Sequence, residues 1–152
     1  MTHPVIIHMT SRLGDGQHPP EVVEFMTEGT LQTEEAGVRL FYNENGDQAP
    51  APCSTVIELE PSGLVSIRRS GGRNGVLLMQ EGKRMLSSYD TGYGSVNLCI
   101  AANRVQSCFD GSSGTVELAY TMELDGEQLG SNHMTIRVKP ATDKGGRKEV
   151  SP

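Results

Sequence analysis

The chain has 152 residues, enough for one domain that buries a hydrophobic core without metal ions or disulfides. Its 13 basic and 19 acidic residues give a net charge of -6, which argues against a nucleic-acid binder, because such proteins need basic surfaces that displace counterions. The three cysteines lack the spacing of a metal site or redox motif, so we expect reduced thiols and no metal centre.

The first residues, Met1 to Met9, contain a short apolar run that His8 interrupts, and no basic segment precedes it. This is the pattern of neither a signal peptide nor a membrane span. We therefore expect a cytoplasmic protein without a membrane partner.

Short runs with a two-residue alternation of apolar and polar side chains predict β-strands along the whole chain. Turn signals rich in Gly, Asn and Asp separate these runs and predict sequential antiparallel hairpins. In chain order, the predicted strands are Val5 to Met9, Val22 to Thr33, Val38 to Tyr42, Cys53 to Glu60, Leu64 to Arg69, Gly75 to Gln80, Lys83 to Tyr89, Val96 to Ile100, Arg104 to Phe109, Thr115 to Leu124 and Met134 to Val138.

About ten one-sided strands in a flat sheet would leave two exposed edges, and closure into a barrel removes them. The pattern therefore predicts an all-β, antiparallel, up-and-down barrel as a single domain over residues 1–139. Residues 140–152 are polar and rich in Gly and Lys, and we expect them to form a disordered C-terminal tail.

Arg69 is in step with Val65 and Ile67, on the strand face that is predicted to point inward. An unpaired buried charge costs several kcal/mol, so an inward cation needs an anion, a ligand or ordered water. In one interpretation, Arg69 and tyrosine hydroxyls hold the anionic or polar end of a small molecule in the lumen. Other polar side chains with inward parity are Tyr42, Glu44, Tyr89, Tyr120 and Asn132.

In the alternative interpretation, Arg69 pairs with Glu44 or Glu28, and the tyrosines and Asn132 close a hydrogen-bond network over one barrel end. The barrel would then be filled by its own side chains and would act as a protein-interaction or structural module. A register shift near Ser70 would instead turn Arg69 outward.

No catalytic constellation emerges from the motifs. The tripeptide Asp90 to Gly92 also occurs in aspartic proteases, but those enzymes need two carboxylates at one site, and the chain has no second copy. An enzyme that uses Arg69 with Tyr89 or Tyr93 for anion binding and proton transfer remains a third alternative. We expect a protein that is not an enzyme and has no cofactor.

Several motifs occur in the order found in a known family: Val65-Ser-Ile-Arg-Arg-Ser-Gly71, Glu81-Gly-Lys83, Tyr89-Asp-Thr-Gly-Tyr-Gly94, Gly114-Thr-Val-Glu-Leu-Ala-Tyr-Thr-Met122 and Asn132-His-Met-Thr-Ile136. The chain resembles the YwiB-like family of bacterial calycin-type β-barrels from about Val5 to Val138. The resemblance implies a lipocalin-like closed barrel of about eight main strands and no settled activity.

The family pattern has counterparts of Arg69, Tyr89, Tyr93 and Asn132. Gly92 stands where a proline is usual, and Gln80 stands where an aromatic residue is usual. Calycin relatives carry fatty acids, retinoids and haem, but a fold does not fix a function. For haem the chain offers no histidine of inward parity, since His8 and His133 both have outward parity.

We therefore expect a barrel that binds a small amphipathic or anionic molecule in its lumen, as a monomer or homodimer. The residues predicted to contact the ligand are Arg69, Tyr42, Glu44, Tyr89, Tyr93, Tyr120 and Asn132.

Overall fold

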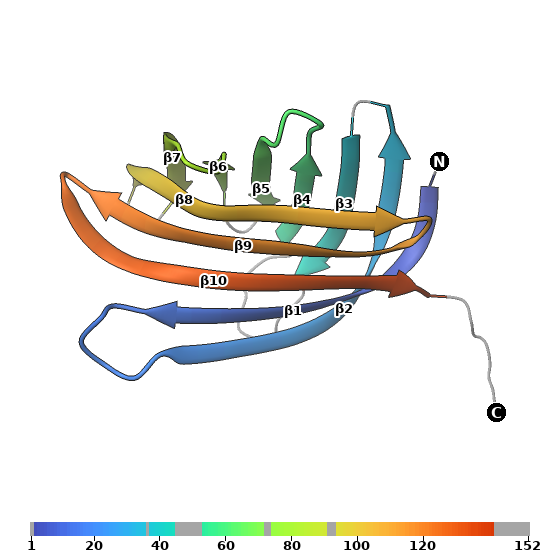
Figure 1. The fold of residues 1–152 in the computed structure, drawn as a ribbon, viewed down its shortest axis with the longest axis horizontal. Coiled ribbons are helices and arrows are strands. Elements are labelled where there is room, and N and C mark those ends of the chain that lie inside the picture. The colour runs from blue at the N-terminus through green and yellow to red at the C-terminus, as the bar shows by residue number, and fades with distance from the viewer. Residues whose placement is uncertain (1, 36, 45–52, 72–73, 91–93, 142–152) are drawn as a thin grey trace.

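The computed structural model describes residues 2–35, 37–44, 53–71, 74–90 and 94–141, which form strands and connecting turns. Consecutive strands pair antiparallel and β1 pairs with β10, so the sheet closes into a barrel (Figure 1). No helix that could cross a membrane occurs in these ranges. The strands are β1 (Thr2–Gly14), β2 (Glu21–Glu34), β3 (Gly37–Glu44), β4 (Cys53–Leu59), β5 (Val65–Gly71), β6 (Gly75–Met79), β7 (Arg84–Asp90), β8 (Ser95–Asp110), β9 (Ser113–Leu124) and β10 (Glu127–Pro140).

The prediction of an all-β antiparallel barrel is confirmed, with differences in strand number and boundaries. The described residues contain ten strands rather than about eight. The last strand extends to Pro140, where the tail was predicted to begin, and the Ala141 N–H donates to the Pro4 carbonyl at 3.0 Å. Residues 142–152, the rest of the predicted tail, lie outside the described residues.

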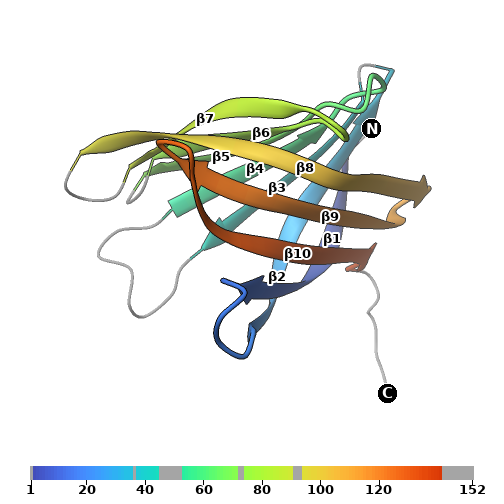
Figure 2. The same cartoon turned by 60° about the vertical axis from the view of Figure 1, so that its left-hand side comes forward.

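The barrel wall consists of two layers of strands, and β2 and β8 pair with strands of both layers. β2 pairs with β1 from Glu21 onward but with β3 only over Gly29–Glu34. β8 pairs with β7 over Ser95–Ala101 and with β9 over Cys99–Asp110. The long strands β8, β9, β10 and β1 therefore form one layer with β2, and the shorter strands β3 to β7 cross them steeply (Figures 1 and 2).

Each of the two shared strands, β2 and β8, has a local irregularity where it passes from one layer to the other: a glycine in β2 and a bulge in β8. A Cβ on Gly29 would lie 2.7 Å from Ile7 Cδ1 and closer still to the Phe41 carbonyl oxygen, so only glycine fits there. In β8 a bulge between Ala102 and Arg104 shifts the register. Bulges bend a strand and sharpen its twist, which suits the corner of a closed barrel.

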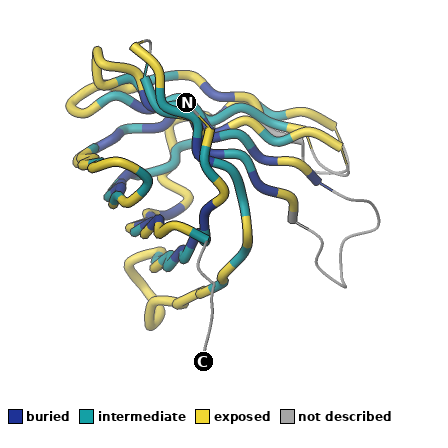
Figure 3. The backbone as a smooth tube through the Cα atoms, turned by 90° about the vertical axis from the view of Figure 1, so that its right-hand side faces the viewer, coloured by how far each residue is buried: buried dark blue, intermediate teal, exposed yellow. Residues whose placement is uncertain are grey.

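The hydrophobic core fills one end of the barrel. Buried residues alternate along most of the strands, as the banding in Figure 3 illustrates. Burial of each large aliphatic side chain contributes about 1.5–3 kcal/mol, so this hydrophobic core supplies much of the driving force for folding. The largest fully buried side chains are Ile7, Leu31, Leu40, Ile57, Met79, Ile100, Leu118 and Ile136.

Candidate functional site

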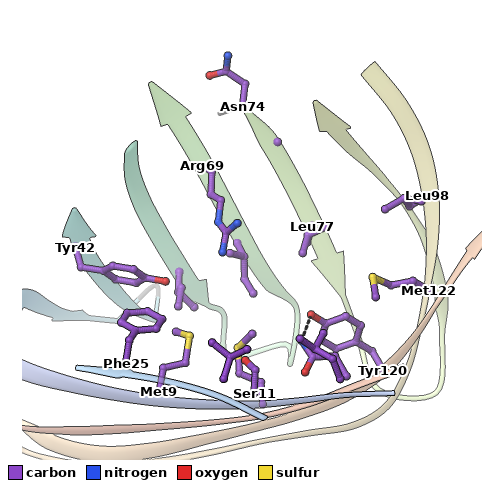
Figure 4. A pocket seen from close by; sticks show the side chains of 17 residues that line it. Met9, Ser11, Phe25, Tyr42, Arg69, Asn74, Leu77, Leu98, Tyr120 and Met122 are labelled. Carbon is purple, nitrogen blue, oxygen red and sulfur yellow. Dashed lines mark hydrogen bonds between the residues drawn. The ribbon is translucent and has the colours of Figure 1, made fainter. Parts of the chain in front are cut away.

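A cavity of about 580 Å³ lies inside the barrel, beyond the filled end (Figure 4). This size is in the range of pockets that bind small molecules. The apolar side chains that line it are Met9, Leu13, Val23, Phe25, Ile57, Ile67, Leu77, Leu98, Met122 and Met134. The polar side chains that line it are Ser11, Tyr42, Arg69, Asn74, Tyr120 and Asn132.

The structure places the Arg69 side chain at this cavity, as the alternation along β5 predicts. Val65 and Ile67 precede it on the same face of β5 and are buried, whereas Arg68 is exposed and lies 3.9 Å from the Glu58 carboxylate. The register partner of Arg69 on β6 is Gly75, which also lines the cavity. In Figure 4 the Arg69 side chain extends from β5 into the cavity.

Tyr120 and Asn132 form a second polar position in the wall. They are register partners on β9 and β10, and the Asn132 Nδ2 donates a hydrogen bond to the Tyr120 hydroxyl at 2.9 Å. Both side chains are buried, with exposed fractions of 4% and 7%. The Oδ1 atom of Asn132 is buried and has no hydrogen-bond partner among the described residues.

The environment of Tyr120 keeps its hydroxyl in the protonated form. Burial raises the pKa of Tyr120 above the ordinary tyrosine value, because the phenolate would lose its hydration. The hydrogen bond from Asn132 and the positive charge of Arg69 act on this pKa in the opposite direction, but they are the smaller effects. The charge of Arg69 therefore acts on the Tyr120 hydroxyl. This agrees with the position of both side chains at the same cavity.

An aromatic pair completes the wall between β2 and β3. The ring centroids of Phe25 and Tyr42 are 6.0 Å apart, and the ring planes are inclined by 50°. Tyr42 is buried, with an exposed fraction of 5%. These rings stand beside the point at which the backbone pairing of β2 with β3 ends at Gly29 and Tyr42.

Four of the seven predicted contact residues line this one cavity: Arg69, Tyr42, Tyr120 and Asn132. The backbones of Glu44 and Tyr89 lie in β3 and β7, but their side chains, and the whole of Tyr93, are outside the described part of the chain. Glu28, the other partner suggested for Arg69, is exposed on β2.

Ser11, Phe25 and Asn74 also line the cavity and were not predicted from the sequence. Ser11 continues the inward series of Val5, Ile7 and Met9, so its position could have been found by extending the alternation past the apolar run. Asn74 lies directly before β6 and outside any strand, so no periodicity exists to predict the direction of its side chain.

The described lining contains no carboxylate, histidine or cysteine side chain, the groups that most often act as general bases and nucleophiles. The histidines of outward parity pair with acidic side chains instead: His8 lies 3.7 Å from Glu24, and His133 lies 2.7 Å from Glu117. No group of three or more metal-binding side chains occurs among the residues that the structure describes.

The fold and the cavity define a class of protein: a closed antiparallel β-barrel with a mainly apolar lumen into which a cationic side chain projects. Residues 7–136 match the family described as "Domain of unknown function (DUF1934)", and the chain belongs to that family. The expected relationship to YwiB-like barrels is thereby confirmed.

Two comparisons agree with this assignment. The chain is 27% identical over 139 residues to the "Uncharacterized beta-barrel protein YwiB" of Bacillus subtilis (strain 168), covering 91% of this chain and 95% of that protein. The fold is similar to the crystal structure of ywiB protein from Bacillus subtilis, with a TM-score of 0.80 and 26% sequence identity over 93% of this chain and 94% of the other. The function of this barrel family is not established.

Proposed function

We propose that this protein binds a small amphipathic organic acid in the barrel lumen and that Arg69 holds the acidic group. The observation that carries the proposal is a guanidinium that projects into a mainly apolar cavity of about 580 Å³. The protein would act as a cytoplasmic carrier or sensor of this molecule, in the manner of calycin-type barrels.

The chemistry of arginine supports an acidic ligand. The planar guanidinium can donate two parallel hydrogen bonds to a carboxylate or phosphate, and such charge-assisted bonds are roughly twice as strong as neutral ones. A ligand that fills this mainly apolar cavity would displace water from around Arg69, which strengthens the attraction between opposite charges. The guanidinium therefore favours an anionic head group over a neutral one.

The walls support an apolar body for the same ligand. Three methionines, Met9, Met122 and Met134, stand among leucine, isoleucine and phenylalanine side chains. Each Å² of apolar surface removed from water contributes about 25 cal/mol, and flexible methionines adapt to ligands of different outline. A barrel that served only as a filled scaffold would be expected to interdigitate these side chains, as it does at the filled end.

Native mass spectrometry of the protein purified from its own host tests the proposal. We expect an additional mass that disappears on denaturation. The Arg69→Met variant should lose this mass, whereas Arg68→Met, which removes the neighbouring exposed arginine on the outer face, should keep it.

The same variants separate a ligand anchor from a structural ion pair. If Arg69→Met unfolds outright while the wild-type protein carries no additional mass, Arg69 serves the stability of the barrel, and the proposed function is wrong. If Arg69→Met folds and retains the ligand as tightly as Arg68→Met does, the lumen binds a ligand but Arg69 is not its anchor.

A further inference from the structure

We infer, on the basis of the proposed function, that the ligand has polar groups at both ends: an acidic group at Arg69 and a hydroxyl group bound by Tyr120 and Asn132. The ligand class is thus an organic acid that carries a hydroxyl group remote from its acidic end.

The two polar positions lie on opposite walls. β5, which carries Arg69, and β10, which carries Asn132, are five strands apart in either direction around the closed barrel. Both side chains nevertheless line the same cavity. A ligand that reaches both must span the lumen, so its polar groups have to be separated by an apolar segment.

The hydrogen-bonding capacity of the second position matches a hydroxyl group. The Tyr120 oxygen already accepts a hydrogen bond from Asn132 Nδ2, so its own O–H remains available to donate. The Asn132 Oδ1 is an acceptor with no partner among the described residues. A hydroxyl group both donates and accepts one hydrogen bond, and it can therefore satisfy Asn132 Oδ1 and the Tyr120 proton together.

The burial of this pair is the reason to expect a ligand group there. Asn132 is 93% buried, since its exposed fraction is 7%, and a buried acceptor without a donor among the described residues costs free energy unless another group supplies the donor. A ligand hydroxyl removes that cost, whereas a methyl group at the same place leaves it. The site should therefore discriminate between two acids that differ only in this group.

Isothermal titration calorimetry with matched acids tests the inference. The probes are pairs of straight-chain acids from hexanoic to dodecanoic acid, each with its ω-hydroxy counterpart. For the chain length that fits best, we expect the ω-hydroxy acid to bind the wild-type protein about tenfold more tightly than the plain acid. Asn132→Leu, which keeps the branching and the number of heavy atoms of the side chain, should abolish this preference and leave the binding of the plain acid.

The possible outcomes distinguish a failure of the hydroxyl assignment from a failure of the proposed acid binding. If plain and ω-hydroxy acids bind equally at every length, the inference is wrong, while the proposed binding of an organic acid stands. If no acid of either kind binds the wild-type protein, both are wrong. Should Asn132→Leu not fold, Tyr120→Phe removes the donor while keeping the ring, and it should reduce the preference by the same reasoning.

Discussion

The aromatic rings of Phe25 and Tyr42 lie 6.0 Å apart, centroid to centroid, across the line at which β2 separates from β3. Backbone pairing between these strands covers only Gly29–Glu34 of β2, so the rings form the wall where that ladder ends. Tilted aromatic pairs at this separation contribute about 0.5–1.5 kcal/mol beyond the area that they bury. The pair both stabilises the barrel and closes the side of the cavity.

Replacement of Phe25 by alanine should open this wall. We expect Phe25→Ala to lower the free energy of unfolding by about 2 kcal/mol, since the half-buried ring is lost, and to increase the binding of a hydrophobic dye to the folded protein. Urea unfolding and dye fluorescence measure the two effects. Met26→Ala, at the next residue, which is 66% exposed, should change stability by less than about 0.5 kcal/mol. Equal effects of the two substitutions would show that the ring pair does not hold the wall.

A side chain at Gly29 should be poorly tolerated. We expect Gly29→Ala to destabilise the barrel by more than about 2 kcal/mol, because the new Cβ overlaps the Phe41 carbonyl oxygen and Ile7 Cδ1. Gly14→Ala is the matched control, since a Cβ there meets only Ser131 Oγ, at 3.9 Å. Thermal unfolding of the two variants measures the difference. A Gly29→Ala protein as stable as Gly14→Ala would mean that β2 bends elsewhere.

Ser87 should matter more than its neighbour Ser88. The pairing of β6 with β7 is limited to Gly75 and Val76, and beyond it the Leu78 N–H donates to Ser87 Oγ at 2.8 Å. We expect Ser87→Ala to cost about 1–3 kcal/mol, since it leaves that N–H without its acceptor. Ser88→Ala, on an exposed position, should be close to neutral. Chemical unfolding of both proteins tests this, and similar midpoints would contradict it.

The titration of Tyr120 should report the charge of Arg69. Because burial raises the folded-state pKa of Tyr120, the stability associated with its neutral form is present below the unfolded tyrosine pKa of about 10 and is lost as pH rises through the folded value. Arg69 lowers this pKa, so Arg69→Met should move it further upward. Ultraviolet absorbance of tyrosinate, with Tyr120→Phe as the reference spectrum, measures the shift. Arg68→Met should leave the titration unchanged, and an equal shift in both variants would contradict the placement of Arg69.

Glu117 should lose its ion pairs as pH falls. The hydrogen bond from His133 lowers the pKa of Glu117, and the charge of Arg104, whose Nε lies 2.9 Å from the carboxylate, acts in the same direction. A depressed pKa stabilises the fold above the unfolded glutamate pKa of about 4.3, and this contribution is lost as pH falls through the folded value.

Removal of His133 tests this assignment. We expect His133→Ala to raise the pKa of Glu117 more than Arg104→Gln does, because the hydrogen bond is the larger cause. Carboxyl-selective nuclear magnetic resonance resolves the titration of Glu117 in each protein. A larger shift in Arg104→Gln would reverse the order of the two causes.

Alternation in the sequence was sufficient to predict the barrel and the inward direction of Arg69, because successive side chains of a strand must point to opposite faces. It failed in β8. Inward positions are even-numbered up to Ala102 and odd-numbered from Val105, so the pattern indicated two strands. The bulge at this point adds one residue without ending the strand. In the sequence it is visible as a shift of the apolar alternation from even-numbered to odd-numbered positions.

The existence of the cavity could not be predicted from the sequence. Leu118 is fully buried in the filled end, whereas Met122, four residues further along the same face, lines the cavity. Both are apolar residues of inward parity, and nothing in their own positions distinguishes them. The space depends on how far the two layers diverge beyond Gly29 and the bulge of β8, which is a property of the assembled barrel.

The pairing of β1 with β10 places Val5 opposite Pro140 and Ile7 opposite Val138. β1 leaves the ribosome before β10, so one edge of β1 stays uncovered until β10 has been synthesised, and contacts of such long sequence separation form slowly. Until β10 is in place, the barrel is open between β1 and β9. The lumen can therefore close only after β10 has been synthesised, and the ligand proposed above would have to enter a completed barrel rather than be enclosed while the chain folds.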